Sequence, residues 1–552
     1  MAELAKGSDD SRLPRVKLEA GEYVWDELLG PARKKFIAAL EQAIARQRWF
    51  GAKSRKRQAL QIVEAIALGE MARLLLVEVL YDSGPSEVYQ VPLAIGETQP
   101  ADLEQSARWI AVHRPAGSLL LYDPLGQDDF AQELLALIAS ERVIDGQAGQ
   151  LTGSRTDRFE QCHGSEERLP SKLLGAEQSN SSIAFDERLV LKVFRRVERG
   201  INPDLEITGY LTARDFKYVA PLAGSFEFRP RGDSSWSLAV LQQYVPNRGD
   251  AWSYYLETVT DFVKRKISEQ EWRQIEVRSS AEISAAARER LPQKVREVFA
   301  EFIPRVERLA ERTAGLHIAL ASSTDDPAFT PEPFTRADHR RFREAAAALA
   351  REAFALLGRH LDDLKPEVRK RAESLLSAAP QFDRRYTSNE QPDVEVAKTR
   401  CHGDYHLGQV LVTADDYVII DFEGEPARPL EERRRKQLAL RDVAGMLRSF
   451  HYVGCTVASS MVDHRDAQKI ERITAAWYFW MSVVFVAAYR RSAAGGVFLP
   501  ANDEQFDAIL SECLLEKATY ELKYELNNRP DWVYLPVTAL CELLGLTTAQ
   551  GA

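Results

Sequence analysis

The chain has little cysteine and no excess of positive charge. Its 552 residues include five cysteines, and 82 Asp and Glu outnumber 72 Lys and Arg, which gives a net charge of −10. The cysteines stand far apart and never as C-x-x-C, so the sequence predicts neither a disulfide framework nor a zinc site and favours a reducing cytoplasm. Nucleic-acid-binding proteins are normally basic, so we expect no nucleic-acid partner.

Long hydrophobic runs are also scarce. Residues 1–15 are polar, which predicts no secretory signal. The most apolar segment, residues 473–489 (ITAAWYFWMSVVFVAAY), is shorter than the roughly 20 residues that span a bilayer, and Trp477, Tyr478 and Trp480 lie inside the segment rather than at its ends. We therefore expect a buried core helix here, no membrane partner and a cytoplasmic location.

One part of the chain concentrates polar residues suited to catalysis: CHGDYHLGQ (401–409), followed by VIIDFE (418–423). It places Asp404 on a tight loop, Gln409 five residues later, and two acids after an apolar strand. Phosphoryl transfer from a nucleotide needs a carboxylate that orients the attacking hydroxyl and further oxygens that hold magnesium. The order matches a kinase catalytic loop, with HGD for HRD. Alone, HGD would be an ordinary turn; with its neighbours it predicts Asp404 as the catalytic residue.

The two acids after the strand are candidate metal ligands. Alternate residues of a strand point to the same side, so Asp421 and Glu423 are expected to face one ion. Mg²⁺ prefers oxygen ligands, and we predict Gln409, Asp421 and Glu423 as its protein ligands. The alternative for Glu423 is that it only begins the next loop. We expect His402 and His406 to brace the loop through hydrogen bonds.

A second charged pair is predicted upstream. Lys192 lies in the apolar run LVLKVF (189–194), which predicts a buried strand. Asn202 is a good N-cap and Pro203 suits a first helical position, so a helix is expected to begin there. Kinases require a strand lysine that reaches the nucleotide phosphates and is held by a helix glutamate. We predict Lys192 and Glu206 as this pair; a strand lysine taken alone would be a surface charge.

Two further segments are expected to contact the nucleotide. Ser179, Asn180 and Ser181 fall in a predicted turn without glycine, whose hydroxyls and amides can still bind phosphate oxygens; an ordinary hairpin turn is the alternative. Gln242 and Tyr244 end a predicted strand and offer backbone groups to an adenine edge. The predicted cofactors are therefore ATP and Mg²⁺.

The order of these segments predicts an α+β fold: bilobal and protein-kinase-like, with a β-rich N-lobe, an α-helical C-lobe and an N-terminal cap subdomain. A chain of this length is expected to form several domains. The predicted parts are a disordered lead (1–20), a cap and intermediate subdomain (21–150), a kinase N-lobe (151–245) and a helical C-lobe with the catalytic loop (246–552).

Several of these segments together resemble bacterial maltokinases, which belong to the aminoglycoside-phosphotransferase-like kinase superfamily. RQRWFGAKSR (46–55) is similar to the cap of that family, and the resemblance extends over residues 40–545. The other segments are GAEQSNSSIAFDERLVLKVFRRVERGINPDLE, CHGDYHLGQVL, IDFEGEPARPLEERRRKQLALRDVAGMLRSF and ATYELKYELNNRPDW. One departure is KQLA (436–439), where the family often has a Lys-Ser-Pro-like sequence.

The resemblance implies an ATP-dependent maltokinase, which transfers the γ-phosphoryl group of ATP to the anomeric hydroxyl of maltose and gives maltose 1-phosphate for α-glucan and glycogen synthesis. It implies maltose as the small-molecule partner and trehalose synthase as a possible partner in trans; a monomer or a homodimer is expected. A polar and aromatic set near the C-terminus is predicted to hold the sugar: Arg441, Asp442, Tyr520, Tyr524, Glu525, Arg529 and Trp532.

Three alternatives stay open. The sugar-facing residues can instead be a packed helix with internal ion pairs. The substrate can be another sugar or an aminosugar such as glucosamine, which an acidic cluster facing its nitrogen would favour. From a different class, the chain can be an inactive kinase fold that only binds ligands, although it retains Lys192, Asp404 and Asp421.

Overall fold

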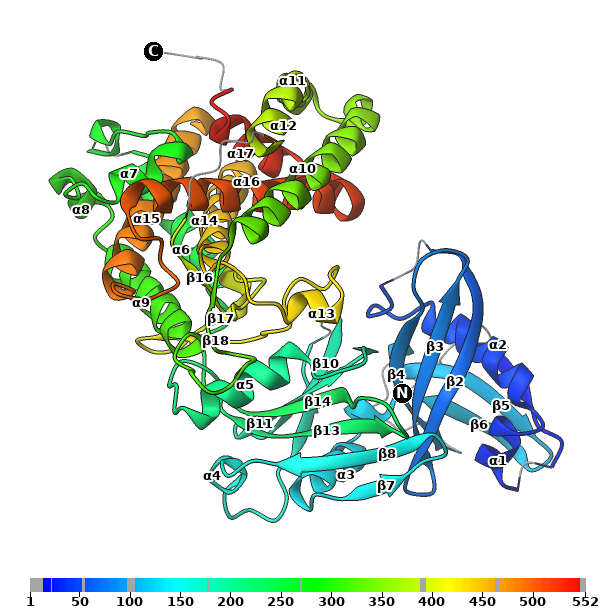
Figure 1. The fold of residues 1–552 in the computed structure, drawn as a ribbon. Helices are drawn as coiled ribbons and strands as arrows, with labels where there is room; N and C mark the ends of the chain where they lie inside the picture. The colour runs from blue at the N-terminus through cyan, green and yellow to red at the C-terminus, as the bar shows by residue number, and fades with distance from the viewer. Residues whose placement is uncertain are drawn as a thin grey trace, which may run out of the picture. The chain divides into compact units, whose positions relative to one another are not determined.

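The computed structural model describes residues 13–20, 22–51, 55–96, 105–175, 179–268, 271–387, 394–461 and 466–546. The chain forms two compact units. One contains the residues up to Thr212 together with Ala220–Pro246, and the other contains Ala213–Val219 and Asn247 onward. The first unit is β-rich and the second is mostly helical (Figure 1), which confirms the predicted fold class.

The first sheet of the β-rich unit forms the cap. Its strands run in the order β1-β5-β6-β4-β3-β2, β12 adds to β4, and α1 and α2 belong to the same core. The bounds are β1 (Arg15–Lys17), α1 (Val24–Leu29), α2 (Arg33–Ile44), β2 (Arg57–Leu68), β3 (Ala72–Tyr81), β4 (Glu87–Gly96), β5 (Arg108–Arg114), β6 (Gly117–Tyr122) and β12 (Arg196–Val197).

Strand β1 departs from the prediction of a disordered lead over residues 1–20. It pairs in parallel with β5, and Val16 and Leu18 are buried because they point into the cap core. Residues 1–12 of that lead lie outside the described residues. The apolar alternation of residues 15–18 is short, which is why the sequence pattern did not reveal a strand.

The second sheet has the order β7-β8-β13-β14-β11-β10-β9 and includes the strand that carries Lys192. It begins at β7, inside the segment predicted as the intermediate subdomain, and shares one apolar core with α3 and part of the cap sheet. The bounds are α3 (Asp128–Ala139), β7 (Val143–Asp145), β8 (Gly149–Arg155), α4 (Phe159–His163), β9 (Ser171–Leu173), β10 (Asn180–Phe185), β11 (Leu189–Phe194), α5 (Pro203–Ala213), β13 (Leu222–Pro230) and β14 (Trp236–Gln243).

The helical unit surrounds two short strand pairs, β15 with β16 and β17 with β18. Its helices are α6 (Ala251–Lys266), α7 (Ile283–Ala286), α8 (Gln293–Val298), α9 (Ile303–Leu320), α10 (Arg336–Arg359), α11 (Pro366–Ser377), α12 (Ala379–Thr387), α13 (Leu430–Arg433), α14 (Leu440–Ser460), α15 (Ala467–Ser492), α16 (Asp503–Asn528) and α17 (Tyr534–Leu543). The strands are β15 (Glu332–Pro333), β16 (Ala397–Lys398), β17 (Val410–Val412) and β18 (Tyr417–Ile419).

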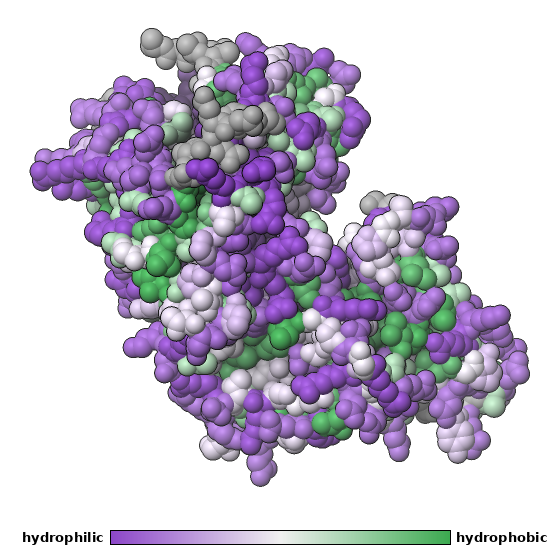
Figure 2. Space-filling model, in the orientation of Figure 1, coloured by the Kyte–Doolittle hydropathy of each residue, from purple (hydrophilic) through white to green (hydrophobic). Residues whose placement is uncertain are grey.

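Helix α15 contains the apolar run that the sequence predicts as a core helix. It alone among the helices of the described residues is long and apolar enough to cross a bilayer, yet 78% of its most apolar window is buried inside the protein. Trp477 and Trp480, in the middle of the helix, are fully buried. The burial is that of a core helix, as predicted. The face of the molecule in Figure 2 is mostly hydrophilic, with apolar residues in separate patches.

Candidate active site

The catalytic loop of the helical unit is held by a buried carboxylate. Asp442, in the first turn of α14, accepts the backbone N–H of His402 at 2.8 Å and that of Gly403 at 3.0 Å, one on each oxygen. His317 of α9 contacts the same carboxylate at 3.0 Å. Gly403 has φ +85°, a conformation that suits glycine. These contacts fix the backbone immediately before Asp404.

This arrangement corrects the prediction that Asp442 faces a sugar. The residue is 1% exposed and both of its oxygens accept loop amides. Burial raises its pKa, but the hydrogen bond from His317, the nearby histidine charges and the loop amides outweigh burial and lower the pKa below its usual value. Asp442 therefore positions the loop from inside the protein.

Helix α14 approaches the loop so closely that a side chain has no room at one position. A Cβ added at Gly445 would lie 2.5 Å from the carbonyl oxygen of Tyr405. Tyr405 is itself buried, and its hydroxyl is 3.0 Å from the Thr313 hydroxyl on α9. The loop is thus packed against helices on both sides of Asp404.

Asp404 contacts a lysine that the sequence reading did not single out. Lys517 of α16 donates from Nζ to Asp404 Oδ1 at 3.1 Å and to Glu425 Oε1 at 2.9 Å. Burial disfavours the charged lysine, but Glu425 and Asp404 outweigh it and raise the pKa of Lys517 well above its usual value. The ammonium thus stays charged and holds one oxygen of Asp404, the predicted catalytic carboxylate.

Glu425 belongs to a buried network of alternating charges. Arg428 donates to Glu425 and to Glu432, and it contacts Glu516 at 3.1 Å. Arg441, predicted as a sugar ligand, also contacts Glu516, at 2.9 Å. Its cationic group is therefore already engaged by α16, and a sugar-facing role for Arg441 stays a prediction.

The two loop histidines have bracing roles, as expected. His402 Nε2 lies 2.9 Å from the Ile420 carbonyl and so links the loop to the end of β18. His406 accepts the Gly408 N–H at 3.1 Å through Nδ1. Burial lowers the pKa of His406, which favours the neutral ring that this acceptor role requires.

The predicted magnesium ligands lie near one another but not on a strand. β18 ends at Ile419, so Asp421 and Glu423 lie on the following turn, which corrects the strand-alternation argument. Asp421 has φ +66°, a left-handed conformation that Asp tolerates better than most residues. A carboxylate oxygen of Asp421 still lies within 4.8 Å of one of Glu423. The Gln409 side chain is partly exposed, and the backbone carbonyl of Gln409 accepts the N–H of Ile420.

The C-terminal half of α16 and the turn that follows it carry the remaining predicted sugar residues. Tyr520 and Tyr524 stack at 6.4 Å between ring centroids, and Lys517 lies over the Tyr520 ring. The Arg529 guanidinium lies 5.4 Å from the Tyr524 ring centroid and 4.9 Å from that of Trp532. The helix repeat of 3.6 residues places Lys517, Tyr520 and Tyr524 on one face of α16. Arg529 and Trp532, just after the helix, continue this strip, which begins beside Asp404.

The carboxylates of this strip are bound to arginines. Glu525 accepts from Arg529 at 2.7 Å and from the Tyr452 hydroxyl at 3.1 Å. Glu521 accepts from the buried Arg448 at 2.8 Å. The alternative of internal ion pairs is therefore correct for Glu525, while Tyr524 is exposed and Trp532 partly exposed.

In the β-rich unit, Lys192 pairs with a different acid from the one predicted. Its ammonium lies 2.9 Å from Asp204 Oδ2, and both side chains are buried. The helix begins as expected, since the Asn202 side chain accepts the Asp204 N–H at 2.9 Å. Glu206 is only partly buried. Residues two apart in a helix point about 200° apart, so the helix that presents Asp204 to Lys192 directs Glu206 elsewhere.

The predicted phosphate turn is shorter than expected. Asn180 and Ser181 belong to strand β10 and pair with Phe194 and Val193. The Ser181 hydroxyl accepts from Arg195 at 2.8 Å. Only Ser179 precedes the strand, and Gln178 lies outside the described residues.

The predicted adenine-facing residues end β14. The backbone of Gln242 pairs with both β11 and β13, and its side chain donates to Thr208. The Tyr244 N–H donates to the Arg188 carbonyl at 2.8 Å. These backbone donors are therefore already engaged within the β-rich unit.

Comparison with known proteins matches two segments of the chain to two family models. Residues 44–126 match the maltokinase N-terminal cap domain, and residues 172–425 match the phosphotransferase enzyme family. The second match contains Lys192, the catalytic loop and the two acids that follow it. Residues 172–425 are therefore similar to the phosphotransferase enzyme family and residues 44–126 to the maltokinase cap, the pattern of a maltokinase-like kinase. This confirms the resemblance seen in the sequence.

Curated relatives of this kinase include two proteins named glucosamine kinase. One, from Streptacidiphilus jiangxiensis, is 34% identical over 143 residues, which is 26% of this chain and 31% of the relative. The other, from Mycolicibacterium smegmatis (strain ATCC 700084 / mc(2)155), is 25% identical over 377 residues, or 67% of this chain and 78% of the relative. A solved glucosamine kinase in complex with glucosamine, ADP and inorganic phosphate aligns with a TM-score of 0.57 at 19% identity and covers 91% of this chain and 98% of its own. A second crystal form gives a TM-score of 0.58 at 20% identity over 92% and 97%. These structures share the fold.

Proposed function

We propose that this protein is an ATP-dependent maltokinase, which transfers the γ-phosphoryl group of ATP to the anomeric hydroxyl of maltose. The observation that carries the proposal is the position of Asp404. It lies on a loop fixed by Asp442, is held by Lys517, and stands at one end of the aromatic strip of α16. A carboxylate so placed suits the task of orienting a sugar hydroxyl.

Asp404 is the proposed catalytic residue. Lys517 engages Oδ1, and we assign Oδ2 to the sugar hydroxyl. Because Lys517 occupies only Oδ1, Oδ2 is available to accept a hydrogen bond from the hydroxyl and then its proton as the O–P bond forms. The bond between the γ-phosphorus and the bridging oxygen breaks, and ADP leaves with that electron pair.

The proposed nucleotide ligands are assigned by residue chemistry, separately for each unit. Lys192, fixed by Asp204, is the proposed phosphate ligand of the β-rich unit. Asp421, Glu423 and Gln409 fit Mg²⁺, because their donors are oxygens and the two carboxylates approach within 4.8 Å. A bound magnesium ion would neutralise charge on the phosphates.

The strip formed by the end of α16 and the following turn is the proposed sugar platform: Tyr520, Tyr524, Arg529 and Trp532. Aromatic faces beside charged hydrogen-bonding groups suit a ligand that is apolar on its ring faces and polar at its edges. Glu521 and Glu525 are bound to arginines, so their charge is already neutralised. That arrangement favours a neutral sugar, since an aminosugar calls for a carboxylate to face its ammonium group. The maltokinase-type cap supports maltose in particular.

A second candidate is a glucosamine kinase, which the names of the relatives favour. Purified protein with ATP and Mg²⁺ would be assayed for ADP release with maltose, glucose and glucosamine, and the phosphorylated carbon would be identified by ³¹P NMR. We expect maltose to give the highest kcat/KM and the phosphate to lie on the anomeric carbon. Faster turnover of glucosamine would transfer the assignment to the aminosugar.

The same assay tests the remaining alternative. Nucleotide binding without turnover of any sugar would indicate an inactive kinase fold and contradict the proposal. We also propose, on the family resemblance, that trehalose synthase associates in trans; co-elution of the two purified proteins in size-exclusion chromatography would support that association, and separate elution would contradict it.

A further inference from the structure

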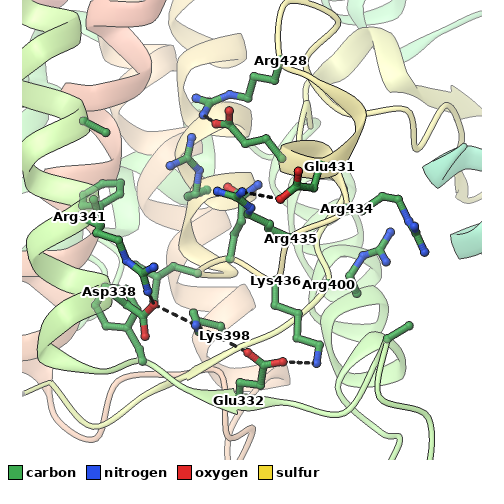
Figure 3. Close-up of a pocket in the computed structure, with 18 of the residues that line it drawn as sticks. Glu332, Asp338, Arg341, Lys398, Arg400, Arg428, Glu431, Arg434, Arg435 and Lys436 are labelled. Atoms are coloured by element: carbon green, nitrogen blue, oxygen red, sulfur yellow. Dashed lines mark hydrogen bonds and ion pairs between the residues drawn. The ribbon is translucent and has the colours of Figure 1, made fainter. Parts of the chain in front are cut away.

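A separate cavity of about 700 Å³ lies within the helical unit (Figure 3). Its walls come from the segment 327–345, from Lys398 and Arg400, from the segment 428–441, and from Glu516 of α16. Asp404 and the rest of the catalytic loop are not among its lining residues. The volume is in the range of small-molecule sites, roughly 300–1,000 Å³.

The lining of this cavity is basic, although the chain as a whole is acidic. Eight Lys and Arg side chains and five Asp and Glu side chains line it, a surplus of three positive charges, whereas the chain has a net charge of −10. Figure 3 shows Lys398, Arg400, Arg435 and Lys436 close together around the hollow. A local surplus of this sign in a concave site attracts anions.

Acids inside the cavity hold the two lysines in fixed places. Lys436 donates to Glu332 at 2.6 Å and to the Pro327 carbonyl at 2.7 Å. Lys398 lies 3.7 Å from Glu332 and 3.0 Å from Asp338. This chain of contacts orders the ammonium groups before any ligand arrives, which lowers the cost of binding an anion.

The arginines at the rim are less firmly engaged. Arg341 pairs with Asp338 and Arg435 with Glu431, and these arginine side chains are 73% and 64% exposed. Exposed pairs of this kind contribute little to stability. A guanidinium has five donors in a planar fork that matches phosphate, so such a group can turn to a phosphate ligand.

One wall of the cavity is apolar. Phe334, Phe342 and Leu438 line it together with two alanines and a proline. An inorganic anion needs only the basic wall, whereas an organic phosphate would use both the cations and the apolar surface. We propose that this cavity binds an organic phosphate of about the size of a sugar monophosphate, at a site distinct from the catalytic loop.

The wall of this cavity is connected to the catalytic carboxylate. Arg428 and Arg441 line the cavity and both contact Glu516, and Arg428 also contacts Glu425, which shares Lys517 with Asp404. A ligand that draws either arginine toward the cavity changes the charge around Lys517. Occupancy is therefore expected to change turnover, an effect that rests on the proposed function, whereas binding itself does not.

Calorimetric titration of the full chain with glucose 6-phosphate, inorganic phosphate and glucose tests the site. The variant is Arg434→Gln/Arg435→Gln in the cavity, and the control is Arg359→Gln/Lys370→Gln, two exposed cations of the same unit outside it. We expect glucose 6-phosphate to bind more tightly than either of the other two probes. The cavity variant should weaken that binding about tenfold or more, because it removes two charged phosphate donors, and the control less than about twofold.

Three results would overturn the proposal, given that the thermal unfolding of both variants matches the parent. They are no binding of glucose 6-phosphate, equal loss in the cavity variant and the control, and equal affinity for glucose 6-phosphate and inorganic phosphate. Tighter binding of a poly-glutamate peptide would assign the cavity to an acidic protein segment instead. The connection to Asp404 is tested separately, by ADP release with a sugar substrate. It is wrong if glucose 6-phosphate binds the parent but leaves ADP release equal in the parent and the cavity variant. If no sugar is turned over at all, the proposed function fails while the binding result stands.

Discussion

The catalytic loop and the outer half of α16 differ in how their charged groups are held. Around the loop, Asp442 and Glu425 are buried and each meets several donors that come from separate elements. At the end of α16, Tyr524 and the following Arg529 are exposed and contact neighbours on that helix or on the turn after it. The fold thus fixes the loop, whereas side chains of the strip can be substituted without a change in the core. Chemistry shared by a family belongs in the first kind of region, and substrate preference in the second.

The largest expected effect comes from Asp404→Asn. The amide keeps the size of the side chain but cannot accept the proton of the sugar hydroxyl, so kcat should fall by about 10²–10⁴-fold. Sugar phosphorylation is measured by ADP release, and thermal unfolding checks that the fold is intact. A variant with near-parental kcat would remove Asp404 from the mechanism and, with it, the contrast between the two regions.

Asp442→Ala should have the second largest effect, mainly as a loss in the free energy of unfolding. Removing one partner of a buried charged network costs about 3–5 kcal/mol, because the amides of His402 and Gly403 and the ring of His317 lose their acceptor. Urea unfolding gives the free energy change. Glu431→Ala, at an acid whose side chain is 85% exposed, is the control and should change it by less than about 0.5 kcal/mol. A similar small change at Asp442 would contradict its anchoring role.

The loop could be predicted because its functional residues lie in one short part of the sequence: Asp404, Gln409 and Asp421 follow one another at fixed spacing. Partners from distant elements were not. The sequence placed the start of α5 correctly at Pro203, but which acid of its first turn faces Lys192 depends on the rotation of the helix, and the answer was Asp204 rather than Glu206. Asp442 was assigned to the wrong side of α14 for the same reason.

Lys517 was overlooked, although α16 was singled out. Its signal is a lysine between two buried residues, Glu516 and Ala518, in the middle of a helix. A charged group in such a place needs a partner, but only the fold shows that the partners are Glu425 and Asp404. The strand at residues 15–17 escaped detection because three residues are too few to display a period.

Glu425 should give the loop network a measurable dependence on pH. Burial raises its pKa, but Lys517, Arg428 and Arg441 outweigh burial and lower it to about 2. The ionised form is therefore favoured in the folded state, and its contribution is present above the unfolded pKa of about 4.3 and is lost as the pH falls toward 2. The parent should lose about 2 kcal/mol more than Glu425→Gln between pH 7 and pH 2.5. Urea unfolding at pH 2.5 to 7 measures this difference, and parallel curves for the two proteins would contradict it.

Gly445→Ala tests how tightly α14 and the loop are packed. The new Cβ would meet the Tyr405 carbonyl at 2.5 Å, so helix or loop must shift, at a cost of about 1–3 kcal/mol. Gly358→Ala on α10 is the matched control, because nothing lies within 4 Å of its Cβ position and alanine favours a helix. The control should be neutral or slightly stabilising in thermal unfolding. Equal destabilisation of both variants would show that the close approach to Tyr405 is not what matters.

The smallest effect is expected from a substitution in α16, and it should change the binding of the sugar but not the chemical step. Tyr524→Ala removes one ring of the stacked pair and the partner of Arg529. A ring contact contributes about 1 kcal/mol, which corresponds to about a fivefold rise in the KM for maltose. The control is Tyr23→Ala in the cap, a tyrosine that is 70% exposed. Because the loop does not contact Tyr524, kcat should stay near the parental value. A fall in kcat with KM unchanged would place this side chain in the chemical step, and the two regions would then no longer differ in the way that their burial indicates.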